Sequence, residues 1–275
     1  LACRESEVLK ERVAFAVGIV CGHLKSTSFA ELFAWQCGIS PTELRGIDFR
    51  TKLPDRSASS YAVTATGVRD GQTITVTKPT SELFGSNWGH GFFKYKACDF
   101  CDDVVGETAD ISIGDAWLPE YESDSGGTNV VVVRSAILNS ILAAASGAGR
   151  LHLENLSAEK VVASQAGGFR HRRDGLAFRL HIEDLAGRWR PAKRVEPSSN
   201  HLDPKQRDIF NLRYEMGQMS HSAFEAAKER NDFDIFTAMV SPLTVRYDKH
   251  YRRPFSLRVL GKIKRKILSL FRQKL

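Results

Sequence analysis

Two cysteines, Cys98 and Cys101, stand two residues apart in the middle of the chain. This spacing lets one turn aim both sulfurs at a single point, which suits a bound metal, an iron–sulfur cluster or a redox-active disulfide. Only three further cysteines occur in 275 residues, at Cys3, Cys21 and Cys37. A sparse and odd set does not fit a secreted disulfide scaffold. We therefore expect reduced thiols in a cytoplasmic protein, some of them acting as ligands.

A carboxylate follows the cysteine pair at a position where ligands tend to bind. Ala109 to Ile113 has the composition of a short buried strand, and Asp115 lies at its exit within Gly114-Asp115-Ala116-Trp117. Strand ends in α/β sheets often carry the groups that contact a ligand. Asp115 is thus a candidate ligand-binding residue, with a simple turn cap as the alternative.

Three stretches together resemble a known family. They are Ala-Cys-Asp-Phe-Cys at 97–101, the run from Glu107 to Trp117, and the run from Gly127 to Ser135. In order and spacing they resemble the C-terminal domain of the beta subunit of coenzyme F420 hydrogenases and dehydrogenases, over roughly residues 1–185. Members of that family are iron–sulfur flavoproteins, so the resemblance implies an oxidoreductase that uses FAD and a 4Fe-4S cluster.

The resemblance also implies a set of metal ligands, since a 4Fe-4S cluster takes four thiolates. Cys98 and Cys101 match the family pattern directly, and Cys21 matches within Val-Cys-Gly-His. Cys3 is the fourth match, although Ala-Cys-Arg departs from the family's Pro-Cys-Gln-like element. The alternatives are a zinc knuckle or a redox pair for Cys98 and Cys101, and a buried strand-end thiol for Cys21. Cys37 has no counterpart and is interpreted as a core residue.

Further candidates for cofactor binding follow from the same resemblance. Lys94 would offset cluster charge or bind a flavin phosphate, unless it is a solvated surface lysine. Asp115 would contact a flavin ring or ribose, and Gly127, Thr128 and Asn129 would present backbone N–H groups and short side chains to a phosphate or ring. His23, next to the Cys21 loop, is the candidate catalytic residue as a proton relay, with an ordinary hydrogen-bonding role as the alternative. No dinucleotide-binding glycine motif, P-loop or nucleophile elbow is present.

The elements that would position these residues predict an α/β (α+β) fold, with a mixed sheet and flanking helices. Val13–Cys21 reads as a buried, parallel strand, residues 61–78 as a hairpin around Asp70-Gly71, and Asn129–Arg134 as a strand before a helix capped by Ser135. We predict an α/β domain over 1–190, a Pro- and Ser-rich linker over 191–204 and a helical extension over 205–275. Within the extension, helices are expected at 205–219, 222–231 and 232–239. Within the α/β domain, residues 167–173 are expected to form a basic loop. Because the chain begins with Leu rather than Met, we expect a fragment whose N-terminal part lies elsewhere.

The net charge of +7 belongs to the C-terminal tail. Residues 246–275 hold eleven Lys and Arg and one acid, and the rest holds 28 basic and 31 acidic residues. A nearly neutral body does not indicate nucleic-acid binding. The tail predicts a basic amphipathic helix that would place the protein at the inner face of an anionic membrane; a docking helix and a solvated helix are the alternatives. We expect an electron-transfer protein or subunit as partner.

A second function fits the same residues. A relative that has lost redox activity would hold zinc, or a cluster, through Cys98 and Cys101. It would then act as a non-catalytic scaffold that docks to a membrane or partner through the basic tail.

Overall fold

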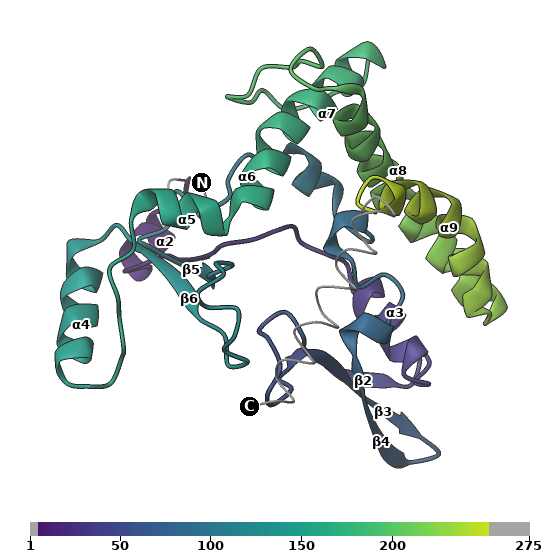
Figure 1. Ribbon diagram of the computed structural model, residues 1–275, viewed down its shortest axis with the longest axis horizontal. Helices are drawn as coiled ribbons and strands as arrows, with labels where there is room; N and C mark the ends of the chain where they lie inside the picture. Colours follow the sequence, from purple (N-terminus) through teal and green to yellow (C-terminus); the bar gives the residue numbers. More distant parts are fainter. Residues whose placement is uncertain (1–4, 253–275) are drawn as a thin grey trace, which may run out of the picture.

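The computed structural model describes residues 5–252, which form two small sheets and a set of helices (Figure 1). The strands are β1 (Val17–Ile19), β2 (Leu44–Thr51), β3 (Ala62–Arg69), β4 (Gln72–Pro79), β5 (Ile111–Asp115) and β6 (Asn129–Val133). The α-helices are α2 (Glu7–Arg12), α3 (Ser28–Gln36), α4 (Ala136–Gly147), α5 (Ala158–Ser164), α6 (Ala166–Arg172), α7 (Asp174–Leu185), α8 (Pro204–Arg230) and α9 (Phe233–Lys249). Short 3₁₀ helices are η1 (Thr80–Glu82), η2 (Trp88–His90) and η3 (Lys96–Phe100).

The first sheet has the order β1-β5-β6 and is mixed. β1 runs parallel to β5, and β6 runs antiparallel to β5. The mixed sheet and the parallel direction of the first strand are therefore confirmed. The expected burial of that strand is wrong, because Val17 and Ile19 are 66% and 76% exposed. As a three-residue edge strand, β1 has a neighbour on one side only.

The second sheet is an antiparallel meander in the order β2-β3-β4. The predicted hairpin is confirmed: Asp70 and Gly71 connect β3 to β4 and both have positive φ, at 51° and 76°. Two left-handed residues are what a tight hairpin turn with the strands' own twist requires.

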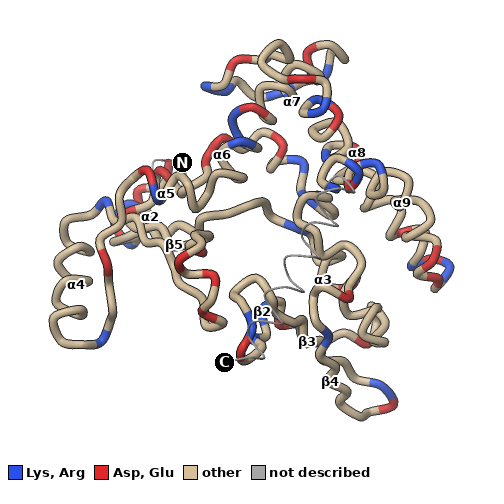
Figure 2. Tube along the Cα trace, viewed as in Figure 1, with Lys and Arg blue, Asp and Glu red and all other residues tan. Residues whose placement is uncertain are grey.

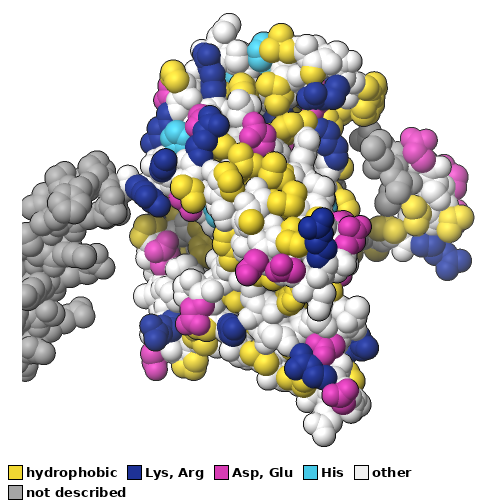
Figure 3. Space-filling view, turned by 90° about the vertical axis from the view of Figure 1, so that its right-hand side faces the viewer, with side chains coloured by type: hydrophobic (Ala, Val, Ile, Leu, Met, Phe, Trp, Pro, Cys, Tyr) yellow, Lys and Arg dark blue, Asp and Glu magenta, His cyan; other side chains and the backbone are white. Residues whose placement is uncertain are grey.

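The main hydrophobic core joins residues from both ends of the described chain. Phe29, Leu32, Phe92 and Phe93 pack in one cluster with side chains of α8 and α9. The α8 and α9 members of this cluster are Leu212, Met216, Ala223, Phe224, Ala227, Phe236, Val240 and Tyr247. The two helices lie side by side next to α3, and Figure 3 faces that side of the molecule, where hydrophobic side chains lie between charged ones. The C-terminal helices therefore share a core with the segment that precedes the cysteine pair.

The predicted helical extension is present within the described residues, but its predicted interruptions are wrong. Residues 204–230 form one helix, and Pro242 lies inside α9. Ser220, at the expected break, instead accepts a 2.8 Å hydrogen bond from the Phe93 N–H and donates to Gly217 O within the helix. The basic loop expected at 167–173 is also wrong, because most of it forms α6.

The division into a body over 1–190, a linker and an extension stays a prediction. The basic tail falls largely on 253–275, outside the described residues. In the part that the structure describes, no helix is both long and apolar enough to cross a membrane.

Candidate functional site

Cys98 and Cys101 lie on one tight turn. Cys98 belongs to η3 and Cys101 directly follows this 3₁₀ helix as its C-terminal cap. The turn is held by a hydrogen bond from the Cys98 N–H to Tyr95 O, at 2.9 Å. Both thiols are half-buried and neither forms a disulfide. One turn therefore carries both reduced thiols, as the two-residue spacing predicts.

The loop that carries Cys21 runs beside this turn. The Leu24 N–H donates to the Cys98 sulfur at 3.3 Å, and the Tyr95 N–H donates to Leu24 O at 3.2 Å. Lys25 and Lys94 form an antiparallel bridge that continues the contact. The chain thus brings together two cysteine-bearing segments that lie far apart in the sequence. Hydrogen bonds from backbone N–H groups to sulfur are among the features that tune a metal-bound thiolate.

The four predicted thiolate ligands are only partly brought together. Cys98 and Cys101 share a turn, Cys21 is exposed on the neighbouring loop, and Cys3 lies outside the described residues. Within residues 5–252, no three His, Cys, Asp or Glu side chains form a group suited to a metal ion. The ligand set therefore stays a prediction. Cys37 caps the end of α3 and is buried beside Ala34, Ile39 and Ala65, as expected for a core residue.

Basic side chains from α6 and α7 hold the two cysteine loops in place. Arg172 donates to Asp103 O and, at 2.8 Å, to Gly22 O, so one guanidinium spans both loops. Arg179, which is 2% exposed, donates to Asp99 O between the paired cysteines. Sequence reasoning misses both arginines, because it predicts a loop at 167–173 and assigns no helix to 174–185.

Lys94 is buried and pairs with the carboxylate of Asp99. Burial lowers the pKa of this lysine to about 8, although Asp99 acts in the opposite direction. Its charge already has a partner from the cysteine turn. Its predicted role as a cofactor ligand stays a prediction, and its observed contact stabilises the turn itself.

His23 lies at the border between the Cys21 loop and an adjoining cavity. The residue is buried, its Nε2 has no hydrogen-bond partner within residues 5–252, and its ring stacks edge-on against Trp88 at 4.9 Å. Burial, followed by the nearby charges of Lys25 and Lys94, lowers its pKa to about 2. The imidazole is therefore neutral at physiological pH. Its catalytic role stays a prediction.

The adjoining cavity, of about 500 Å³, has several aromatic side chains in its lining. It is lined by residues that include His23, Lys25, Ser26, Phe29, Phe49, Tyr61 and Trp88. Lys25 Nζ lies 4.0 Å from the Phe29 ring centre and donates to Phe92 O. Burial, and then Arg213 and Lys94, lower the pKa of Lys25 to about 7. We call this the aromatic pocket; the sequence signals for it were the aromatic run from Trp88 to Phe93 and Phe29.

The aromatic pocket fits a planar, partly polar ring better than a simple apolar ligand. The Ser26 hydroxyl and His23 Nε2 are buried and have no hydrogen-bond partner in the part of the chain that the structure describes. Buried polar groups are normally paired, so two such groups beside aromatic faces suit a ligand that supplies hydrogen bonds of its own. This chemistry matches a flavin ring.

Asp115 lies at the edge of the same pocket. It is the last residue of β5 and pairs with Arg50, whose guanidinium lies 4.7 Å from the Tyr61 ring and 5.4 Å from the Trp117 ring. Arg50 and Tyr61 line the aromatic pocket. Asp115 itself does not line the pocket but pairs with Arg50, which does, and its predicted role in cofactor binding stays a prediction.

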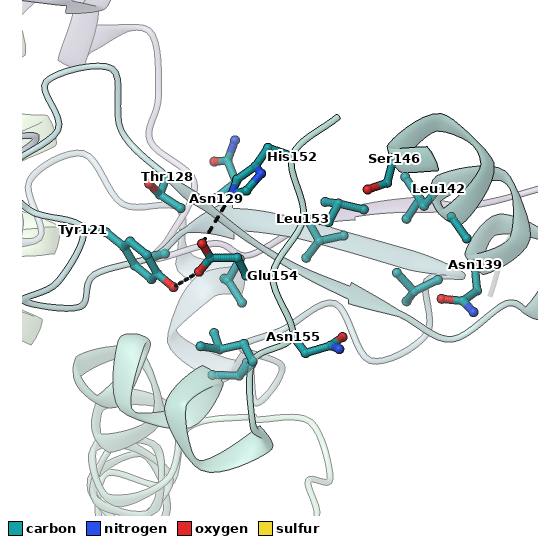
Figure 4. A pocket seen from close by; sticks show the side chains of 17 residues that line it. Tyr121, Thr128, Asn129, Asn139, Leu142, Ser146, His152, Leu153, Glu154 and Asn155 are labelled. Carbon is teal, nitrogen blue, oxygen red and sulfur yellow. Dashed lines mark hydrogen bonds and ion pairs between the residues drawn. The ribbon is translucent and has the colours of Figure 1, made fainter. Parts of the chain in front are cut away.

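Thr128 and Asn129 face a different cavity. They line a space of about 690 Å³ between β6, α4 and residues 152–156. In this cavity, Figure 4 shows Glu154 accepting a hydrogen bond from the Tyr121 hydroxyl, with His152 3.3 Å from the same carboxylate. Gly127 precedes them with φ of 78°. None of the three lines the aromatic pocket, and their predicted role in cofactor binding stays a prediction.

The fold and these sites define an α/β protein in which a turn with two cysteines lies beside an aromatic, cationic pocket. The sequence profile of one family, described as the C terminus of the beta subunit of coenzyme F420 hydrogenase/dehydrogenase, matches residues 1–159. The chain belongs to this family, which confirms the resemblance and makes it an oxidoreductase-related subunit. A comparison with curated proteins finds no match. The matched range ends within α5, so α6 to α9 lie beyond it.

Proposed function

We propose that this chain is the iron–sulfur flavoprotein subunit of an oxidoreductase, and that it passes electrons between a flavin and a 4Fe-4S cluster. When bound, the flavin exchanges a hydride with substrate and the cluster exchanges single electrons with a partner protein or subunit. The protein's own residues would hold the two groups close together and exclude water between them.

The ligands proposed for the cluster are Cys98, Cys101, Cys21 and Cys3. The Leu24 N–H donates to the Cys98 sulfur, and the buried cations Lys94 and Arg179 pair with Asp99 between the two cysteines, so these contacts hold the turn in the conformation that presents both sulfurs. The residues proposed for the flavin line the aromatic pocket, with Trp88 and Phe49 against the ring and Lys25 and Ser26 toward its polar edge. His23 would then lie between the two groups.

One observation carries the proposal. The segment from His23 to Ser26 lines the aromatic pocket, and the N–H of Leu24 in this segment donates to the Cys98 sulfur. A ring in the pocket and a metal at the cysteine turn would therefore be separated by a single strand-like segment. That proximity suits electron transfer between them.

Cofactor content of anaerobically purified protein tests the proposal. Iron, sulfide, zinc and flavin are measured in the parent chain, in a Cys98→Ser, Cys101→Ser double variant, and in Cys37→Ser as the matched control. About four irons per chain, lost in the double variant and kept in the control, is the expected result. Colourless protein without iron or sulfide would contradict it.

A second function is favoured by the sequence around Cys3, Ala-Cys-Arg, which departs from the family's Pro-Cys-Gln-like element. In this alternative, Cys98 and Cys101 hold zinc in a non-catalytic scaffold. About one zinc per chain without iron or flavin, in the same measurement, would support it.

The setting of the protein follows from the proposed activity. A beta subunit works beside other subunits, so an electron-transfer partner is proposed. We also propose a cytoplasmic location, with the basic tail at the inner face of the membrane.

A further inference from the structure

A separate cavity of about 390 Å³ lies between α6 and the first turns of α8. Its lining includes Arg170 and His171 from α6, Lys205, Phe210 and Arg213 from α8, and Tyr251. All of these residues lie beyond the range matched by the family profile. None of them lines the aromatic pocket. We call this cavity the α6–α8 pocket.

The charge of the α6–α8 pocket is strongly positive. Arg170, Lys205 and Arg213 line it, and within residues 5–252 none of the three forms an ion pair with a carboxylate. Asp203 is the acid in the lining, and its side chain caps α8 by accepting from the Gln206 N–H at 2.7 Å. Basic positions recur along α6 and α8 in Figure 2. Cations gathered without counter-charges favour an anionic ligand.

Two buried nitrogen atoms of the lining, His171 Nδ1 and Arg213 Nε, have no hydrogen-bond partner within residues 5–252. Arg213 is otherwise anchored by donating to the Tyr247 hydroxyl at 3.4 Å. Burial, and then the charges of Arg213 and Arg179, lower the pKa of His171 well below its usual value, so the ring is neutral. Arg213 Nε is always a donor, and a buried donor without a partner beside a cationic cavity is explained if a bound ligand supplies an acceptor.

The other side chains of the lining indicate what kind of anion the pocket would bind. Guanidinium groups match the oxygens of phosphate with paired hydrogen bonds. Phe210, Ile209 and Tyr251 add apolar surface to the lining. The combination fits a phosphoryl group attached to a flat or apolar organic part.

We propose that the α6–α8 pocket binds a small organic phosphate monoester, with its phosphoryl group between Arg170, Lys205 and Arg213 and its organic part against Phe210 and Tyr251. This proposal does not rest on the proposed redox function. It does connect to the cysteine loops, since Arg172 follows His171 on α6 and donates to both of those loops. A ligand bound in the pocket would therefore contact α6, the helix whose Arg172 holds both cysteine loops.

Calorimetric titration of the full chain with phenyl phosphate and with inorganic phosphate, at constant ionic strength, tests this proposal. One saturable site per chain is expected, with phenyl phosphate binding more tightly because its ring covers the apolar surface. The Arg170→Ala, Lys205→Ala double variant removes two exposed cations and should weaken binding at least about tenfold, since charge-assisted hydrogen bonds are lost.

Two matched proteins make the outcome decisive. Arg230→Ala, Lys249→Ala removes the same two residue types from exposed positions elsewhere on α8 and α9 and should bind as the parent chain does. The Cys98→Ser, Cys101→Ser variant should also keep phosphate binding, because the pocket is separate from the cysteine turn. The proposal is overturned if binding is absent, if it survives in Arg170→Ala, Lys205→Ala, if the control loses it equally, or if the cysteine variant loses it together with flavin.

Discussion

Lys96, two residues before Cys98, donates a 2.7 Å hydrogen bond to the buried carboxylate of Glu183 on α7. Glu183 also accepts from Tyr214 of α8 and from Arg188. The cysteine turn is thus fixed by a carboxylate from a helix that lies beyond the range matched by the family profile. Burial alone would raise the pKa of Glu183, but the hydrogen bonds from Arg188, Lys96 and Tyr214 outweigh it and lower the pKa to about 2.

The Glu183 carboxylate predicts a loss of stability in acid. Because the folded-state pKa of Glu183 is lowered, its contribution is present above about pH 4.5 and is lost as pH falls toward 2. Glu183→Gln should therefore have a lower free energy of unfolding than the parent chain at neutral pH. In acid, the free energies of unfolding of the two proteins should be closer. Urea unfolding of both proteins at several pH values measures this. An equal difference at all pH values would contradict the assignment.

Removal of the Arg179 guanidinium should be strongly destabilising. Arg179 is 2% exposed, donates to Asp99 O and lies 3.9 Å from the Asp99 carboxylate. Arg179→Met leaves the buried Asp99 carbonyl without its donor and removes one cation from a buried charge network, which typically costs about 3–5 kcal/mol. Denaturant unfolding gives the value. Exposed Arg230, changed to Met on α8, is the matched control and should alter stability by no more than about 0.5 kcal/mol.

Lys25 predicts a pH dependence in the alkaline range. Burial lowers its folded-state pKa to about 7, whereas the unfolded chain keeps a lysine near 10.5. Between these values the unfolded state binds more protons, so the lysine's unfavourable contribution fades as pH rises. The free energy of unfolding of Lys25→Met should therefore exceed that of the parent chain most at about pH 6, and the difference should fade by about pH 10. A constant difference between the two proteins across this range would argue against a buried lysine.

Truncation tests the predicted division at residue 190. A chain ending at Arg190 lacks Leu212, Met216, Phe224 and Phe236, which pack in one core with the phenylalanines near the cysteine turn. We expect this truncated chain to lose cooperative thermal unfolding and near-ultraviolet circular dichroism, because its remaining core is exposed. A chain ending at Tyr251 keeps α8 and α9 and is the control. Cooperative unfolding of the shorter chain would establish 1–190 as an independent domain.

The tail prediction is tested with lipid vesicles. Because eleven basic residues lie in 246–275, the full chain should float with anionic vesicles at low salt and be released as salt rises. A chain ending at Tyr251 should remain unbound. If both chains behave alike, the membrane role of the tail is wrong.

Local sequence signals predicted the elements that depend on local chemistry. Asp70-Gly71 indicated the hairpin, and Ser135 indicated the start of α4, where its hydroxyl accepts from the Leu138 N–H. The cysteine pair lies on one turn, as its two-residue spacing requires. In each case neighbours within a few positions are sufficient to fix the geometry.

Elements that depend on distant partners were not predictable in the same way. Pro242 indicated a helix end, yet buried Phe236, Val240 and Tyr247 keep α9 packed on the core across it. Two glycines indicated a loop at 167–168, yet Arg172 ties that segment to both cysteine loops as α6. The aromatic pocket and the α6–α8 pocket are lined by residues from separated segments, so no pattern of neighbouring residues predicts either of them.

The bond from Arg172 to the Gly22 carbonyl joins positions 150 residues apart. Such distant pairings form late, because a long loop must close before they are made. During synthesis, the loop that carries Cys21 therefore leaves the ribosome long before the helix that fixes it. The Cys21 loop therefore reaches its final position only once α6 has been made, although the cysteine itself is synthesised early.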